Sequence, residues 1–167
     1  MMYSDIVERK DSLQRLFDRA IELQKNDVID LEVRSAFESY LCIRTYVYVE
    51  NSVRTILLEH VRSVTKDDSI EKFVDSQLER QPNLRYGELI KLVSRFNPEW
   101  QEKIKQGVTQ KMLTSLNSLV SIRNSIAHSD NTDISLNDLQ DYFSSSQEIV
   151  RIVFEVCSAG SMAKSRD

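Results

Sequence analysis

The chain has 167 residues, enough for one domain with a substantial hydrophobic core. Three glycines and two prolines are few for a chain with many turns, which disfavours a fold built from β-sheets. A net charge of −4 and a pI of about 5.3 exclude the overall basic charge that non-specific nucleic-acid binding requires.

Helical periodicity dominates the N-terminal half of the chain. It predicts a first helix over residues 4–25 and a long second helix over residues 28–64. The centre of the second helix, residues 41–58, is apolar on more than one face, which is typical of a helix packed on several sides. The β-branched run TYVYV at 45–49 would suit a strand, but no turn residues bound it, so we predict a helix there.

The C-terminal half is predicted to form shorter helices and one long final helix. These helices cover residues 70–80, residues 86–96, the piece from Pro98 to a break at Gly107, residues 109–128 and residues 135–157. A polar loop, HSDNTD, precedes the last helix, for which Ser135 and Asp138 resemble an N-capping pair. We therefore predict one all-α bundle over residues 1–160, followed by a flexible tail over residues 161–167.

Several features point to a cytoplasmic protein without a cofactor. Cys42 and Cys157 lie far apart in apolar surroundings, which favours buried thiols in a reducing compartment over a disulfide. The N-terminal run MMYSDIVERKD lacks the apolar core of a signal peptide, and no apolar run reaches the roughly 18 residues of a membrane span. His and Cys are not spaced as metal ligands, and no glycine-rich phosphate loop is present. We expect no metal, no cofactor and no membrane partner.

One charged side chain interrupts the apolar stripe of the helix predicted for residues 109–128. At about 100° per residue, this stripe consists of Met112, Leu113, Leu116, Leu119, Val120, Ile126 and Ala127. Arg123 falls in its middle, between Val120 and Ala127. Because arginine is rarely buried without a partner, its position indicates that this part of the stripe faces a cleft or a partner surface.

His128 follows Arg123 by five residues, about 140° round the helix, so an unbroken helix would not aim both side chains at one point. The helix is predicted to end at His128, where the backbone can turn the ring back towards Arg123. Asn124 adds a neutral donor and acceptor between them. Two alternatives stay open: His128 as a favourable charge at a helix C-terminus, and Arg123 as a snorkelling side chain or the partner of a buried carboxylate.

The long second helix offers such a carboxylate. Glu50 and Arg54 lie four residues apart within an apolar stripe of that helix, a spacing that favours a structural ion pair between them. The alternative is that Glu50 reaches across the bundle and orients Arg123 or His128.

The run RNSIAH resembles the signature of the HEPN superfamily, in which four to six residues separate an arginine from a histidine and the residue directly after the arginine is polar. Arg123, Asn124 and His128 match this signature position by position, and Glu50 fits the internal polar residue of the family's long early helix. The longer run SLVSIRNSIAHSDNTDIS is most similar to the RiboL-PSP-HEPN branch, found in bacterial defence and toxin systems. In related toxins a modifiable tyrosine follows the histidine. Here Ser129 and Asp130 follow, which argues against that mode of control.

The resemblance implies an all-α, HEPN-like bundle with a long central helix, acting on RNA as a homodimeric, metal-independent ribonuclease. Arg123 and His128 would be catalytic, with Asn124 and Glu50 supporting them. A histidine, which titrates near neutrality, exchanges protons with a ribose 2′-hydroxyl or a 5′-oxygen, and a guanidinium holds phosphate. The products would carry 2′,3′-cyclic phosphate and 5′-hydroxyl ends, and an antitoxin or regulatory protein would be a further partner. The alternative is a non-catalytic HEPN-like module that dimerises or binds a nucleotide or a protein.

Overall fold

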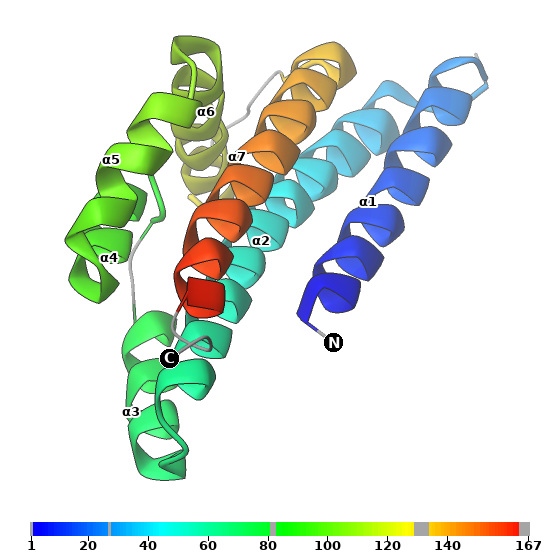
Figure 1. Cartoon of the computed structure of the whole chain (residues 1–167). Coiled ribbons are helices and arrows are strands. Elements are labelled where there is room, and N and C mark those ends of the chain that lie inside the picture. The colour runs from blue at the N-terminus through cyan, green and yellow to red at the C-terminus, as the bar shows by residue number, and fades with distance from the viewer. Residues whose placement is uncertain (1, 27, 81–82, 129–133, 164–167) are drawn as a thin grey trace.

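The structure is a computed structural model that describes residues 2–26, 28–80, 83–128 and 134–163, with side chains between residues 4 and 159. Over these residues the chain forms seven α-helices and no strand (Figure 1). The helices are α1 (Met2–Gln24), α2 (Leu31–Val64), α3 (Asp68–Glu79), α4 (Tyr86–Phe96), α5 (Pro98–Gly107), α6 (Gln110–Ala127) and α7 (Leu136–Ala163). The predicted all-α fold is confirmed.

The long helix α2 forms the centre of the bundle. It packs against α1, α3, α6 and α7, and its contact with α7 is the most extensive in the molecule (Figure 1). Its buried side chains therefore point in several directions, and they include Leu41, Cys42, Tyr46, Val49, Val53, Ile56 and Leu57. The run TYVYV lies within α2, where tertiary packing outweighs the β-propensity of its residues, as the sequence predicts.

Local capping sets most of the helix boundaries. The Asp30 carboxylate accepts a hydrogen bond of 2.6 Å from the Glu32 N–H, so α2 begins at Leu31, later than predicted. The Ser135 hydroxyl accepts a hydrogen bond of 3.1 Å from the Asp138 N–H, which confirms the predicted capping pair before α7.

The predicted end of α7 at Cys157 is wrong, because the helix continues to Ala163 and includes Gly160. A single glycine costs a helix only about 1 kcal/mol and does not end it. The tail predicted for residues 161–167 therefore begins inside this helix. Residues 164–167 of that tail and 129–133 of the predicted loop lie outside the described residues.

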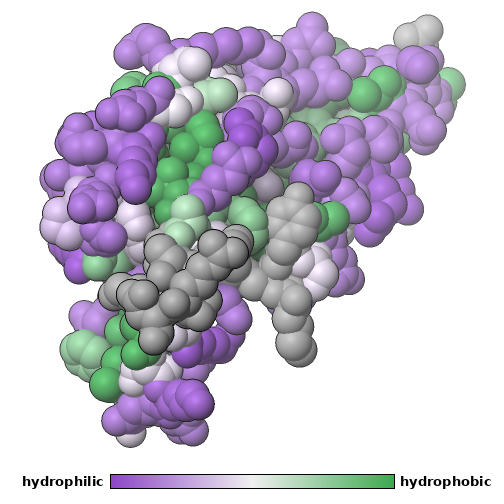
Figure 2. Space-filling view, in the orientation of Figure 1, coloured by the Kyte–Doolittle hydropathy of each residue, from purple (hydrophilic) through white to green (hydrophobic). Residues whose placement is uncertain are grey.

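Helix α3 lies at one end of the bundle, against the C-terminal part of α2 (Figure 1). Its outward face carries apolar side chains, of which Phe73 is 64% and Ile70 46% exposed, and Figure 2 shows hydrophobic surface at this end. In the described part of the chain, no helix is both long and apolar enough to span a membrane.

Candidate active site

The three motif residues lie at the C-terminal end of α6. The helix ends at Ala127, and His128 caps it, because the His128 N–H donates to the carbonyl oxygens of Asn124 and Ser125 at 3.1 Å each. The His128 side chain is exposed and makes no hydrogen bond to any described residue. The helix thus ends where the sequence predicts, but the structure brings the His128 ring into no direct contact with Arg123.

Arg123 is half-buried and is held by two uncharged groups. Its Nη1 donates to the Asn124 side-chain oxygen at 3.1 Å, and its Cζ lies 5.2 Å from the centre of the Tyr46 ring on α2. Among the described residues, no carboxylate lies within ion-pair distance of its guanidinium. Within the described part of the chain, the positive charge of Arg123 is therefore not balanced by a carboxylate, and its guanidinium has several N–H donors that an anionic ligand can use.

Tyr46, which sequence reasoning missed, connects Arg123 to the rest of the site. Tyr46 is 2% exposed, and its hydroxyl donates to Glu50 Oε1 at 3.3 Å and accepts from the Leu84 N–H at 3.2 Å. Burial raises the pKa of the Tyr46 phenol, so the hydroxyl stays protonated and remains a donor to Glu50. The spacing of Tyr46 and Glu50, four residues apart on one helix, could have revealed this pair.

Glu50 is half-buried, and the structure places it one side chain away from Arg123. The two residues form no ion pair; instead, Tyr46 lies between them and contacts both. Glu50 therefore makes no hydrogen bond or ion pair with Arg123 or His128, the alternative that the sequence left open. Glu50 reaches the arginine only through the tyrosine.

The predicted ion pair between Glu50 and Arg54 is wrong. The Arg54 Nε donates to Asp75 at 2.6 Å and its Nη2 donates to Glu79 at 2.7 Å, both on α3. These hydrogen bonds raise the pKa of Arg54 and lower the pKa of Asp75. The carboxylates that bind Arg54 belong to α3, which folds back against α2. The spacing of residues along α2 gives no information about this tertiary contact.

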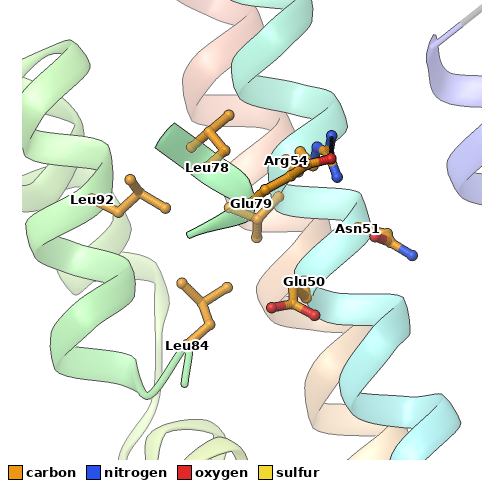
Figure 3. A pocket seen from close by; sticks show the side chains of 8 residues that line it. Glu50, Asn51, Arg54, Leu78, Glu79, Leu84 and Leu92 are labelled. Atoms are coloured by element: carbon orange, nitrogen blue, oxygen red, sulfur yellow. Dashed lines mark hydrogen bonds and ion pairs between the residues drawn. The ribbon is translucent and has the colours of Figure 1, made fainter. Parts of the chain in front are cut away.

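A cavity of about 140 Å³ lies beside Glu50, between α2, the end of α3 and α4 (Figure 3). Leu78, Leu84 and Leu92 form one side of it. Glu50 and Arg54 lie on the opposite side (Figure 3). The cavity therefore combines an apolar wall with a charged one and is open to solvent.

The segment before α4 is fixed against α6 by two side-chain contacts. The Asn117 side chain accepts from the Tyr86 N–H at 3.0 Å, and an Arg85 guanidinium N–H donates to the Ser121 hydroxyl at 2.9 Å. Arg85 is exposed and bound to a residue two positions before Arg123. It is a second cation near the motif that the sequence pattern did not single out.

No group of three or more His, Cys, Asp or Glu side chains within the described ranges is arranged to hold a metal ion. Cys42 and Cys157 are free and buried, as predicted, and burial raises the pKa of each thiol to about 12. Neither thiol is therefore available as a thiolate ligand or nucleophile at neutral pH.

Comparison with known protein families gives one match. The family model described as RiboL-PSP-HEPN matches residues 4–159, a range that includes Arg123, Asn124, His128 and Glu50. No curated protein and no solved structure gives a significant match. HEPN domains are helical and include nucleases and nucleotide-binding modules.

Proposed function

Because the chain belongs to the RiboL-PSP-HEPN family, as the run RNSIAH predicts, we propose that it is a metal-independent endoribonuclease. The observation that carries this proposal is Arg123, a half-buried guanidinium that no described carboxylate neutralises. A guanidinium held by an amide and an aromatic ring is suited to bind a phosphate, because none of the described carboxylates competes with the phosphate for its charge. His128 follows at an exposed helix end, where RNA can reach it.

The proposed reaction is an internal transesterification of RNA. The ribose 2′-oxygen attacks the adjacent phosphorus and forms the O2′–P bond, while the P–O5′ bond breaks. A neutral His128 accepts the 2′-hydroxyl proton, or a protonated His128 donates a proton to the leaving 5′-oxygen. Arg123 stabilises the charge that accumulates on the phosphoryl oxygens, and Asn124 orients it through the 3.1 Å hydrogen bond.

A homodimer would supply both proton transfers, because two copies of His128 would then share one composite site. We propose that the dimer is the active form and that it serves a bacterial defence or toxin system, controlled by a partner protein. The apolar, half-buried end of the α6 stripe around Arg123 supports such an interface.

The second candidate function is a non-catalytic HEPN-like module that binds a nucleotide or a protein. Two observations favour it: the net charge of −4, and the lack of any described hydrogen bond between His128 and Arg123. Binding of RNA without a change in its length would be the behaviour of such a module.

Incubation of total RNA with the purified protein, with and without EDTA, separates the two functions. The nuclease proposal expects cleavage in both conditions, abolished in His128→Ala and reduced at least a hundredfold in Arg123→Met. Intact RNA at high protein concentration would favour the binding module. Cleavage that EDTA stops would indicate a different mechanism.

A further inference from the structure

The cavity beside Glu50 is large enough to take one aromatic ring. Its volume, about 140 Å³, is close to that of a protein cavity of about 150 Å³ that holds one benzene molecule. Leu84 and Leu92 supply an apolar wall against which a ring can pack, and Figure 3 shows both leucines facing the Glu50 side of the cavity. The opening to solvent leaves room for a larger group attached to the ring.

Glu50 provides a hydrogen-bonding group to this cavity, whereas the side chain of Asn51, which also lines it, points away from the leucines (Figure 3). The other charges compensate one another, because Arg54 is bound to Asp75 and Glu79. Glu50 Oε1 accepts one hydrogen bond from Tyr46, while Oε2 accepts none from the described residues. Because a carboxylate offers about four acceptor sites, Glu50 can accept further hydrogen bonds from a ligand. It has no described cation within ion-pair distance.

Tyr46 places this cavity next to the proposed phosphate site. The Tyr46 ring lies against the Arg123 guanidinium, while its hydroxyl contacts both Glu50 and the backbone N–H of Leu84, which line the cavity. The phosphate-binding group and the cavity are therefore separated by one tyrosine side chain.

From this juxtaposition we propose that the cavity binds the base of the nucleotide whose 3′-phosphate is held by Arg123, and that Glu50 selects guanine. The inference rests on the proposed function. The Watson–Crick edge of guanine carries two adjacent donors, N1–H and the 2-amino group, which match a carboxylate. Uracil presents one N–H between two carbonyl oxygens, which the carboxylate would repel. Glu50 thereby acts as a specificity-determining residue.

Binding of nucleoside 3′-monophosphates, measured by calorimetry at fixed ionic strength, tests the inference without any cleavage. The wild-type protein should bind guanosine 3′-monophosphate at least tenfold more tightly than uridine 3′-monophosphate. Inosine 3′-monophosphate, which keeps N1–H and lacks the 2-amino group, should fall between them. Equal affinities for the three nucleotides would overturn the proposal.

Variants then assign the preference to Glu50. Glu50→Gln replaces two acceptors with one acceptor and one donor, so the preference for guanine over uracil should disappear. Glu59→Gln removes a carboxylate from the same helix, one that is paired with Arg62 at the surface, and should keep the preference. A preference that persists in Glu50→Gln would contradict the assignment. If Glu50→Gln does not fold, the comparison of the three nucleotides with the wild-type protein still tests the preference for guanine.

The outcome is separable from that of the proposed function. Arg123→Met should weaken binding of all three nucleotides by the same factor, because it removes a phosphate contact and leaves the cavity. A guanine preference that depends on Glu50, in a protein that cleaves no RNA, would support the cavity and contradict the nuclease. RNA cleavage by a protein that binds the three nucleotides equally well would support the nuclease and contradict the base-binding cavity.

Discussion

Arg123 occupies a half-buried position in which an arginine ordinarily pairs with a carboxylate. Among the described residues, the fold supplies an amide and an aromatic ring in place of that carboxylate, and Glu50 is hydrogen-bonded to the same tyrosine, Tyr46, that contacts Arg123. An arginine without a described carboxylate partner is poorly explained by stability alone. We propose that its charge serves to bind a ligand.

Arg123→Met separates function from stability at this position. The substitution removes a charge from an apolar stripe, and the methionine sulfur can still contact the Tyr46 ring, so the free energy of unfolding should stay within about 1 kcal/mol of wild type. RNA cleavage should fall at least a hundredfold, which corresponds to about 3 kcal/mol of lost transition-state stabilisation.

Urea denaturation and single-turnover cleavage measure the two effects independently. A loss of about 3–5 kcal/mol in stability, rescued by Glu50→Gln, would mean that the arginine balances a buried carboxylate and would overturn this explanation.

Tyr46 should act as a positioning residue for Arg123. Tyr46→Phe keeps the ring beside the guanidinium but leaves the Leu84 N–H without its partner, so stability should drop by about 1–2 kcal/mol. The rate of the cleavage step should fall less than tenfold in Tyr46→Phe and much further in Tyr46→Leu, which removes the ring. Comparable losses of cleavage in the two variants, measured at saturating protein, would assign the effect to the hydroxyl instead.

The helices themselves could largely be predicted from the sequence, because the information that defines them is local. The break at Pro98, the capping pair of Ser135 and Asp138, and the end of α6 at His128 each depend on residues within a few positions. The end of α7 was missed because Gly160 resembles a stop signal yet lies within the helix.

The contacts between helices could not be predicted in the same way. The motif residues were found because Arg123 disturbs a periodic pattern along one helix. The partners of Arg54 lie on α3, and Tyr46 meets Arg123 only because α2 and α6 pack together. The contact of Tyr46 with Arg123 and the cavity beside Glu50 both arise from tertiary packing, which leaves no disturbance in the local pattern, so sequence analysis missed them.

Helix α3 should detach from α2 in acid before the rest of the bundle opens. Its ion pairs with Arg54 and Arg62 lower the pKa values of Asp75 and Glu71 below their ordinary values. A carboxyl with a lowered pKa contributes stability above its ordinary value, near pH 4, and loses that contribution as the pH falls through the lowered value. Protection factors of α3 amides, measured by hydrogen exchange, should therefore drop below about pH 4, while those of α2 and α7 persist.

Two arginine variants test the contribution of these ion pairs at neutral pH, one that breaks the contact with α3 and one that serves as its control. Arg54→Gln should lower the protection of α3 already at pH 7. Arg151→Gln, which removes an arginine paired only within α7 among the described residues, should leave α3 unchanged. Simultaneous loss of protection in all helices of the acidified protein would mean that α3 has no separate stability.

At the scale of the whole molecule, we expect a homodimer formed around the end of α6. Ile43 on α2, 36% exposed, lies one helical turn before Tyr46, and Ala127 is exposed at the end of the α6 stripe. Sedimentation should show a dimer at tens of micromolar protein, and Ile43→Glu should give an inactive monomer. Phe73→Glu, an equivalent change on the exposed face of α3, should stay dimeric. A wild-type monomer at this concentration, active on RNA, would remove the composite site.

We propose that the 2′-hydroxyl of RNA is the nucleophile and that His128 moves its proton. Deoxyoligonucleotides that each carry a single ribonucleotide, one for each of the four bases, test this claim in the presence of EDTA. The wild-type protein should cut only after the ribonucleotide and leave 2′,3′-cyclic phosphate and 5′-hydroxyl ends by mass spectrometry, whereas His128→Ala should cut none of them. Cleavage of the all-deoxy control, products with 5′-phosphate ends, or unchanged cleavage by His128→Ala would contradict it.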